Sequence, residues 1–158
     1  MRLVSVWVEK YMSLENLGFN LGDDIHFKFE FDPIKRTLNI DAEKTNEYFD
    51  LFKGSKIKNI TDIIGNNGAG KTSFLKLLNL CESKKPIENC AVLIFKDDNS
   101  SKYIIYNYGQ MFKIKQINII PGDLFVKLIG AYKLEQIVDD NPFRNFDILF
   151  YSNLYSEH

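Results

Sequence analysis

The sequence predicts an α/β fold in which a β-rich N-terminal part precedes a strand, a glycine-rich turn and a helix. Apolar and polar residues alternate through much of the first forty residues, as in half-buried strands. A β-branched run at residues 57–64 then meets Gly65 abruptly. Residues 72–81 follow with the pattern of a helix that is apolar on most of its circumference. The 158 residues suffice for one domain with a sizeable core.

Composition narrows the class of protein. The 20 Lys and Arg residues against 21 Asp and Glu give a net charge of -1, so no global basic field indicates nucleic-acid binding. Cys81 and Cys90 lack metal-ligand spacing and are too few for a disulfide framework, which favours a reducing, cytoplasmic location. Neither a signal peptide nor a membrane-spanning stretch is indicated, so we expect no membrane contact.

Strands are expected in the first forty residues. Residues 3–9 alternate, which predicts a strand with Val4, Val6 and Val8 on one face. Residues 25–31 place apolar side chains between His26, Lys28 and Glu30, and a turn at Asp32-Pro33 leads into a second run at residues 34–40. This pattern predicts a hairpin with one apolar face and a solvated His26. Residues 41–56 are polar and mixed, which indicates a short helix or a loop.

The most informative segment is the glycine-rich turn at residues 65–72. It reads Gly-Asn-Asn-Gly-Ala-Gly-Lys-Thr and fits the phosphate-binding pattern of glycine, four variable residues and Gly-Lys-Thr. Its glycines let the backbone N–H groups point at phosphate oxygens, and the following helix adds its positive end. Lys71 is expected to contact the β- and γ-phosphates, and the Thr72 hydroxyl to ligate Mg²⁺. The expected nucleotide-binding residues are Gly65, Asn66, Asn67, Gly68, Ala69, Gly70, Lys71, Thr72 and Ser73.

The remainder of the chain, residues 83–158, reads as β-rich. Residues 91–97 and 103–108 predict two strands, with Asp97-Asp98 as a hairpin turn rather than a Mg²⁺-binding pair. Residues 111–120 look like a strand, whereas residues 123–138 fit either a helix or a further strand. Asp139-Asp140 is expected in a loop, and residues 146–153 as a core strand that ends at Asn153.

Residues 60–73 resemble the nucleotide-binding loop of ABC-type ATPase heads, especially the SMC-like and overcoming-lysogenization-defect-like branches. The Asn67-Gly68 pair carries the resemblance, and residues 6–16 are similar to the opening strand and turn of such heads. It implies a P-loop NTPase core of ABC type over residues 1–158, here incomplete. Its parts would be an antiparallel β-subdomain at 1–56, the strand, loop and helix at 57–82, and a β-rich remainder at 83–158.

The resemblance also implies function. Such heads bind ATP and Mg²⁺, form homodimers that sandwich ATP, and hydrolyse it with a signature segment and an acidic strand that are not visible here. We therefore expect Lys71 to act in catalysis, Asn153 to sense the metal ion, and this chain alone to show weak or no turnover. DNA repair or anti-phage defence with DNA and a nuclease partner would follow by analogy. The alternatives are a small nucleoside or nucleotide kinase, another NTPase, and a module that binds nucleotide only to associate.

Overall fold

A computed structural model describes residues 2–46, 60–82, 90–97, 102–108, 116–120 and 125–131. Its strands are β1 (Arg2–Tyr11), β2 (Leu14–Asn20), β3 (Ile25–Asp32), β4 (Thr37–Lys44), β5 (Ala91–Asp97), β6 (Lys102–Tyr108), β7 (Gln116–Ile120) and β8 (Phe125–Ala131). Helix α1 (Lys71–Glu82) is the one helix within these ranges.

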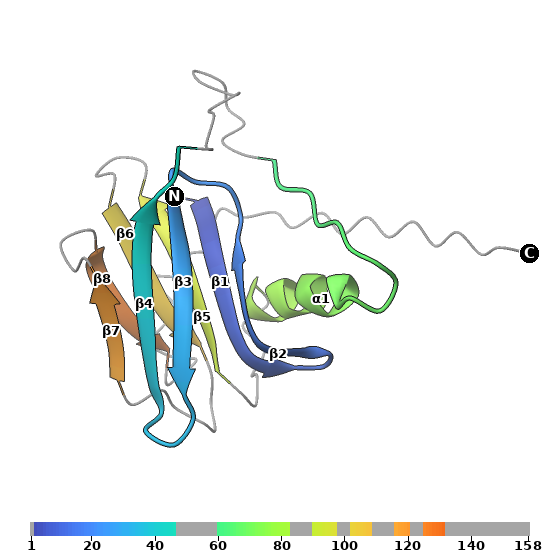
Figure 1. The fold of residues 1–158 in the computed structure, drawn as a ribbon, viewed down its shortest axis with the longest axis horizontal. Helices are drawn as coiled ribbons and strands as arrows, with labels where there is room; N and C mark the ends of the chain where they lie inside the picture. Colours follow the sequence, from blue (N-terminus) through green and yellow to red (C-terminus); the bar gives the residue numbers. More distant parts are fainter. Residues whose placement is uncertain are drawn as a thin grey trace, which may run out of the picture.

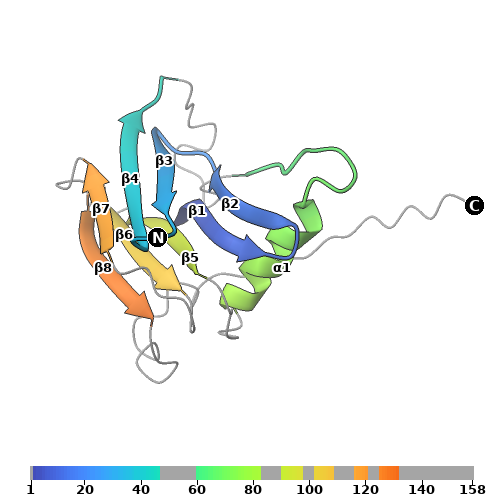
Figure 2. The same cartoon turned by 60° about the horizontal axis from the view of Figure 1, so that its bottom comes forward.

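The strands form two mixed sheets. The larger sheet has the order β2-β1-β5-β6-β8, in which β6 and β8 are parallel and the other pairs antiparallel. The smaller sheet has the order β3-β4-β7, with β4 and β7 parallel. Helix α1 covers one face of the larger sheet and the smaller sheet covers the other, so the molecule has three layers (Figure 1). Figure 2 shows α1 running beneath β1 and β2.

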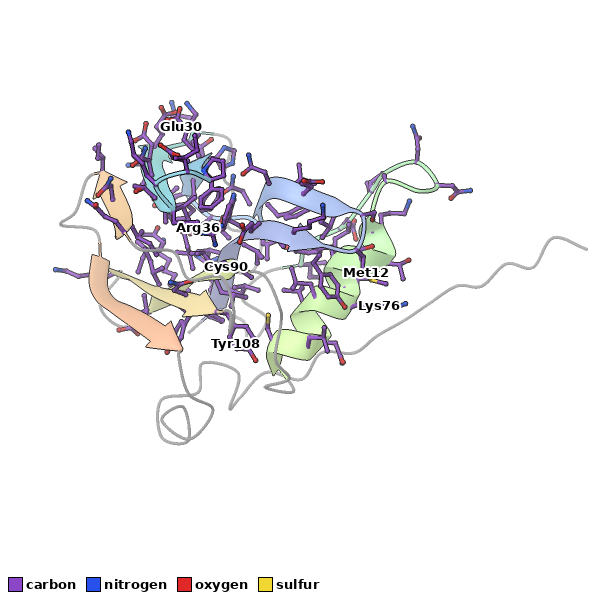
Figure 3. All side chains as sticks on the ribbon, turned by 90° about the horizontal axis from the view of Figure 1, so that it is seen from below. Met12, Glu30, Arg36, Lys76, Cys90 and Tyr108 are labelled. Carbon is purple, nitrogen blue, oxygen red and sulfur yellow. The ribbon has the colours of Figure 1, made fainter. Side chains whose placement is uncertain are left out.

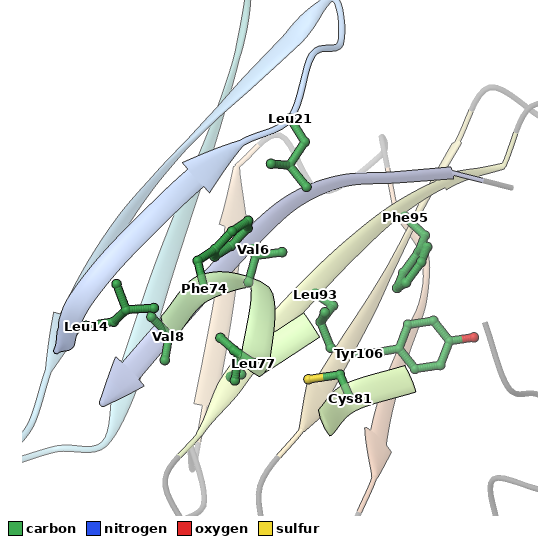
Figure 4. Close-up of a cluster of buried hydrophobic side chains, with 11 residues drawn as sticks. Val6, Val8, Leu14, Leu21, Phe74, Leu77, Cys81, Leu93, Phe95 and Tyr106 are labelled. Atoms are coloured by element: carbon green, nitrogen blue, oxygen red, sulfur yellow. The ribbon is translucent and has the colours of Figure 1, made fainter. Parts of the chain in front are cut away.

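Two apolar clusters hold these layers together. The cluster on the helix side, drawn in Figure 4, joins Phe74, Leu77 and Cys81 of α1 to side chains of β1, β2, β5 and β6. The cluster between the sheets is formed around Trp7 by side chains of β1, β3, β4, β5 and β6. Strand β5 contributes to both, because Leu93 and Phe95 face the helix while Val92 and Ile94 face the smaller sheet. Its continuous apolar sequence is what a strand buried on both faces requires.

The prediction that Val4, Val6 and Val8 of β1 share one face is wrong. Its pairing with β5 shifts register between Leu3 and Ser5, which is a β-bulge. A bulge adds one residue to one strand and reverses the alternation beyond it. Val4 therefore faces the smaller sheet with Trp7, whereas Val6 and Val8 face α1. The three valines do not share a face.

The predicted fold class is wrong. An α/β P-loop NTPase core alternates strands and helices, and its helices cover both faces of a mainly parallel sheet. The described residues instead form eight strands and one short helix, and a second sheet occupies the face opposite α1. Connections as short as Met12-Ser13 and residues 33–36 favour antiparallel hairpins, because a parallel crossover needs a dozen or more residues.

Some of the individual strands and helices predicted from the sequence are present in the structure and others are not. The 25–40 hairpin, the strands at 91–97 and 103–108 and the helix at 72–81 are confirmed, and His26 is exposed as predicted. The undecided 123–138 segment forms β8 over residues 125–131, and residues 116–120 form β7. Residues 41–44 extend β4 instead of starting a helix or loop, and β2 was not predicted. Residues 139–140 and 146–153 lie outside the described residues.

The predicted strand before the glycine-rich turn is wrong over its described part. Residues 60–64 have no regular secondary structure, and Ile60 and Ile64 are 63% and 91% exposed. A β-branched sequence favours an extended backbone, but a strand also needs a pairing partner. No partner strand is paired with these residues within the described chain.

Candidate functional site

The glycine-rich turn curls tightly between residues 60–64, which have no regular secondary structure, and α1. Gly68 and Gly70 have φ angles of 84° and 88°, which place both in the left-handed region that favours glycine. Within the turn, Ala69 N–H donates to Asn66 O at 3.1 Å. Residues 65–69 are exposed, so the outer side of this turn is open to solvent.

The turn leads directly into the N-terminus of α1. The first hydrogen bond of the helix runs from Phe74 N–H to Gly70 O at 2.9 Å. The N–H groups of Lys71, Thr72 and Ser73 precede it and therefore have no acceptor inside the helix. These donors and the positive end of the helix dipole favour an anion at this position. No acidic side chain lies in the first helical turn to compete with an anion.

Lys71 places a cation at the same turn. Its Nζ donates to Gly65 O and, at 2.8 Å, to Asn66 O. These carbonyls are exposed, and the contact folds the lysine side chain back over the turn. Neutral carbonyl oxygens do not compensate the charge of an ammonium group, so an anionic acceptor would bind it more strongly.

The two hydroxyl residues after Lys71 have different environments. Thr72 is exposed at the start of α1. Ser73 is buried, and its Oγ lies 2.9 Å from Ser13 Oγ in the turn between β1 and β2. Ser73 therefore links the start of the helix to the β1–β2 turn by a hydrogen bond. Of the two hydroxyl groups, that of Thr72 is accessible to a ligand or a metal ion.

The glycine-rich turn packs against the β1–β2 turn. A Cβ atom on Gly70 would lie 2.7 Å from Leu14 Cδ2 and 3.3 Å from Ser13 Oγ, so only glycine fits here. Leu14 is buried in the cluster under α1. The position of the turn is thus fixed by the core of the larger sheet.

A cleft of about 340 Å³ lies beside this turn. One wall consists of Gly18–Asn20 at the end of β2 and Leu21, which follows it. The other wall is Thr61–Ile64, and one end is closed by Ala69, Gly70, Lys71 and Phe74. Phe19, Ile63 and Phe74 belong to or pack against the cluster under α1. Asn66, Asn67, Gly68 and Thr72 do not line the cleft, so it lies between the turn and the core rather than on the outer side of the turn.

The structure brings together all nine predicted nucleotide-binding residues, Gly65 to Ser73, in one turn and the first turn of α1. Asn153, the predicted metal-sensing residue, lies outside the described residues. Asp97 is the last residue of β5 and pairs with Lys102 of β6, as expected for the start of a hairpin connection. Among the described residues, no group of three or more His, Cys, Asp or Glu side chains is arranged to hold a metal ion.

Two charged clusters were missed by the sequence analysis. Buried Asp23 accepts hydrogen bonds from Arg2 at 2.7 Å, Lys96 at 2.9 Å and Tyr103 OH at 2.6 Å, and Lys96 also pairs with Asp24. Burial opposes the charge of Asp24, but its hydrogen bonds with Lys96 and Asp23 and the positive charge of Lys96 together outweigh burial and lower the pKa of Asp24. This cluster anchors the β2–β3 connection, next to the cleft wall at Leu21.

The second cluster joins Arg36, in the β3–β4 turn, to Glu9 and Cys90. Arg36 Nη1 and Nη2 bind the two carboxylate oxygens of Glu9, and Arg36 Nη2 lies 3.7 Å from Cys90 Sγ. Figure 3 shows Arg36 and Cys90 close together. Cys81 is also buried, and burial raises its pKa to about 12, so its thiol stays protonated at neutral pH. Neither cysteine forms a disulfide.

Comparison of the chain with protein-family models, with curated proteins and with solved structures gives no match. No helix in the described ranges has the length and apolar character that would take it across a membrane.

Proposed function

We propose that this protein binds Mg²⁺-ATP through residues 65–72. The observation that carries the proposal is the curled turn at Gly68 and Gly70, which leads into the open N-terminus of α1 and holds the Lys71 ammonium over its own carbonyls. Backbone donors, the helix dipole and one lysine cation at a single turn suit a polyphosphate better than a neutral ligand.

The roles of the residues follow from their positions. Lys71 Nζ exchanges its bonds to Gly65 O and Asn66 O for the β- and γ-phosphate oxygens. The N–H groups of Lys71, Thr72 and Ser73, which have no acceptor inside the helix, bind the remaining oxygens. The exposed Thr72 hydroxyl ligates Mg²⁺, which keeps several waters and phosphate oxygens as its other ligands.

The class of ATPase rests on the sequence of the turn. Its similarity to ABC-type heads of the SMC-like and overcoming-lysogenization-defect-like branches supports a cytoplasmic ATPase that pairs with a second copy around ATP. DNA repair or anti-phage defence, with DNA and a nuclease partner, is the corresponding biological role. Hydrolysis needs a group that positions the attacking water, and Lys71 supplies only charge neutralisation. We therefore expect weak or no turnover by this chain alone.

A second candidate is nucleotide binding that drives association without hydrolysis. It needs only the backbone donors and the Lys71 cation of the exposed turn, without a group that positions water. A phosphate-release assay separates the two functions. Both would bind ATP, but only the ATPase would release inorganic phosphate.

The binding proposal is tested by calorimetric titration of Mg²⁺-ATP into the wild-type protein and Lys71→Ala. Loss of the lysine–phosphate bonds is expected to weaken binding by about tenfold to a hundredfold. Lys76→Ala is the matched control, because Lys76 is an exposed lysine on the same helix and its loss should leave binding unchanged. Equal affinities of wild type and Lys71→Ala would show that the turn is not the nucleotide site.

A further inference from the structure

The outer edge of β2 lies across the cleft from residues 61–64, which form no ladder with it. Strand β2 is the terminal strand of the larger sheet, so one row of its backbone groups has no neighbouring strand among the described residues. Thr61–Ile64 lies across the cleft from it. The Thr61 hydroxyl donates to Leu21 O at 2.7 Å and joins the two walls at one end.

The course of the chain fixes the direction in which the two walls run. Thr61 contacts Leu21, just beyond the end of β2, while Gly70 packs on Leu14 at its start. Residues 61–70 therefore run antiparallel to β2. Starting from the contact of Thr61 with Leu21, this direction places Asp62, Ile63 and Ile64 opposite Asn20, Phe19 and Gly18. These are the residues that form the two walls of the cleft.

Side-chain faces agree with this register. Ile63 and Phe19 both pack against the cluster under α1, so they already lie on the same side of the sheet. Ile64 would then lie on the opposite side, next to Gly18. Phe29 of β3 packs directly on Gly18, since a Cβ atom there would be 2.4 Å from Phe29 Cδ2. Pairing would thus give Ile64, now 91% exposed, an apolar neighbour.

We propose that binding of a polyphosphate at the glycine-rich turn closes the cleft by pairing Thr61–Ile64 with Gly18–Leu21 as a short antiparallel ladder. Lys71 links the two events. In the present structure its Nζ holds the carbonyls of Gly65 and Asn66, the two residues that directly follow the segment. When Lys71 turns to phosphate, these carbonyls are released and the segment can move onto β2. The inference rests on the proposed function and adds a conformational response to it.

Hydrogen–deuterium exchange of the full chain with and without Mg²⁺-ATP tests this closure. Leu21 N–H already donates to Val4 O, so within Gly18–Leu21 the amides that face away from β1 are those of Gly18 and Asn20. We expect these two amides and those of Asp62 and Ile64 opposite them to exchange about tenfold more slowly with nucleotide, because both sides of a new ladder gain hydrogen bonds. Protection of Thr61–Ile64 alone would mean that the ligand merely covers the segment, and would overturn the inference. Calorimetric binding with no change in either segment would also overturn it but leave the proposed function standing, whereas absence of binding would overturn both.

A pair of matched variants checks the register. Ile64→Ser should reduce the protection of both segments and weaken Mg²⁺-ATP binding by about threefold to tenfold, because the closed state loses the contact with Phe29. Ile60→Ser should change neither, since Ile60 precedes the paired residues. Both isoleucines are exposed in the present structure, so both variants should fold. Equal behaviour of the two variants contradicts the proposed register.

Discussion

Single residues decide the shape of the glycine-rich turn. Gly68 and Gly70 both have a positive φ, but only Gly70 is also in close contact with other atoms. No atom lies within 4 Å of the position that a Cβ on Gly68 would occupy. Backbone strain alone therefore requires glycine at 68, whereas strain and packing on Leu14 both require it at 70.

This difference predicts unequal costs of alanine at the two positions. Gly68→Ala should lower the free energy of unfolding by about 1–2 kcal/mol, the cost of a left-handed conformation for a residue with a side chain. Gly70→Ala should cost about 1–3 kcal/mol more, because its methyl group overlaps Leu14. Urea unfolding of both variants measures the difference. Equal losses of stability would contradict the packing of the turn on the β1–β2 connection.

The chemistry of the turn could be predicted from the sequence, but its supports could not. Glycine, lysine and threonine at fixed spacing indicate a phosphate-binding backbone because each residue type has a local physical role. The partner of Ser73 is 60 residues away, and buried Asp23 is bound by Lys96 and Tyr103, 73 and 80 residues away. No local pattern indicates such contacts, because they depend on which strands become neighbours.

At the scale of elements, periodicity predicted the existence of most strands and of α1 but not their faces. The β3–β4 hairpin follows from strict alternation and the Asp32-Pro33 turn, in which Asp32 Oδ1 accepts the N–H groups of Ile34 and Lys35. The bulge in β1 could not be foreseen, because Val4, Val6 and Val8 read as one face in sequence. Strand β2 was missed because Leu14–Asn20 carries little apolar alternation and gains its stability by pairing with β1.

The β3–β4 turn is attached to β1 by the Arg36–Glu9 pair, and this attachment predicts a pH dependence. Partial burial opposes the charge of Glu9, but the hydrogen bonds from Arg36 and from Cys90 N–H outweigh it and hold the pKa of Glu9 below its ordinary value of 4.5. A carboxyl whose pKa is lowered by folding stabilises the protein above its unfolded pKa. This contribution is therefore complete above about pH 5 and is lost as the pH falls through the folded pKa.

Glu9→Gln should cost about 2 kcal/mol at pH 7, because it removes the carboxylate charge that binds a largely buried guanidinium. We expect denaturant unfolding at intervals of about one pH unit between pH 3 and pH 7 to show this effect. The difference in unfolding free energy between Glu9→Gln and wild type should shrink below about pH 4.5. The exposed pair of Lys28 and Glu43 is the control, and Glu43→Gln should change stability little. A pH-independent cost of Glu9→Gln would contradict the ionic character of the contact.

At the scale of the whole molecule, the sequence indicated strands and one buried helix but misassigned how they are layered. The apolar run at residues 91–95 fits a strand buried on both faces, and such a strand occurs equally between helices or between a helix and a second sheet. The structure has the second arrangement, because the β3–β4 hairpin and β7 cover the face opposite α1. The glycine-rich turn keeps its predicted residues at the start of α1 even though the surrounding fold is mostly β.

The central claim is that the amides of this turn receive polyphosphate, and backbone ¹⁵N NMR during addition of Mg²⁺-ATP tests it most directly. We predict saturable changes in the Gly68, Gly70, Lys71 and Thr72 amide resonances, much smaller changes at exposed β3 positions such as Lys28, and the same glycine and lysine changes with inorganic tripolyphosphate. Resonances of residues 65–72 that stay fixed while nucleotide saturates the protein elsewhere would contradict the claim.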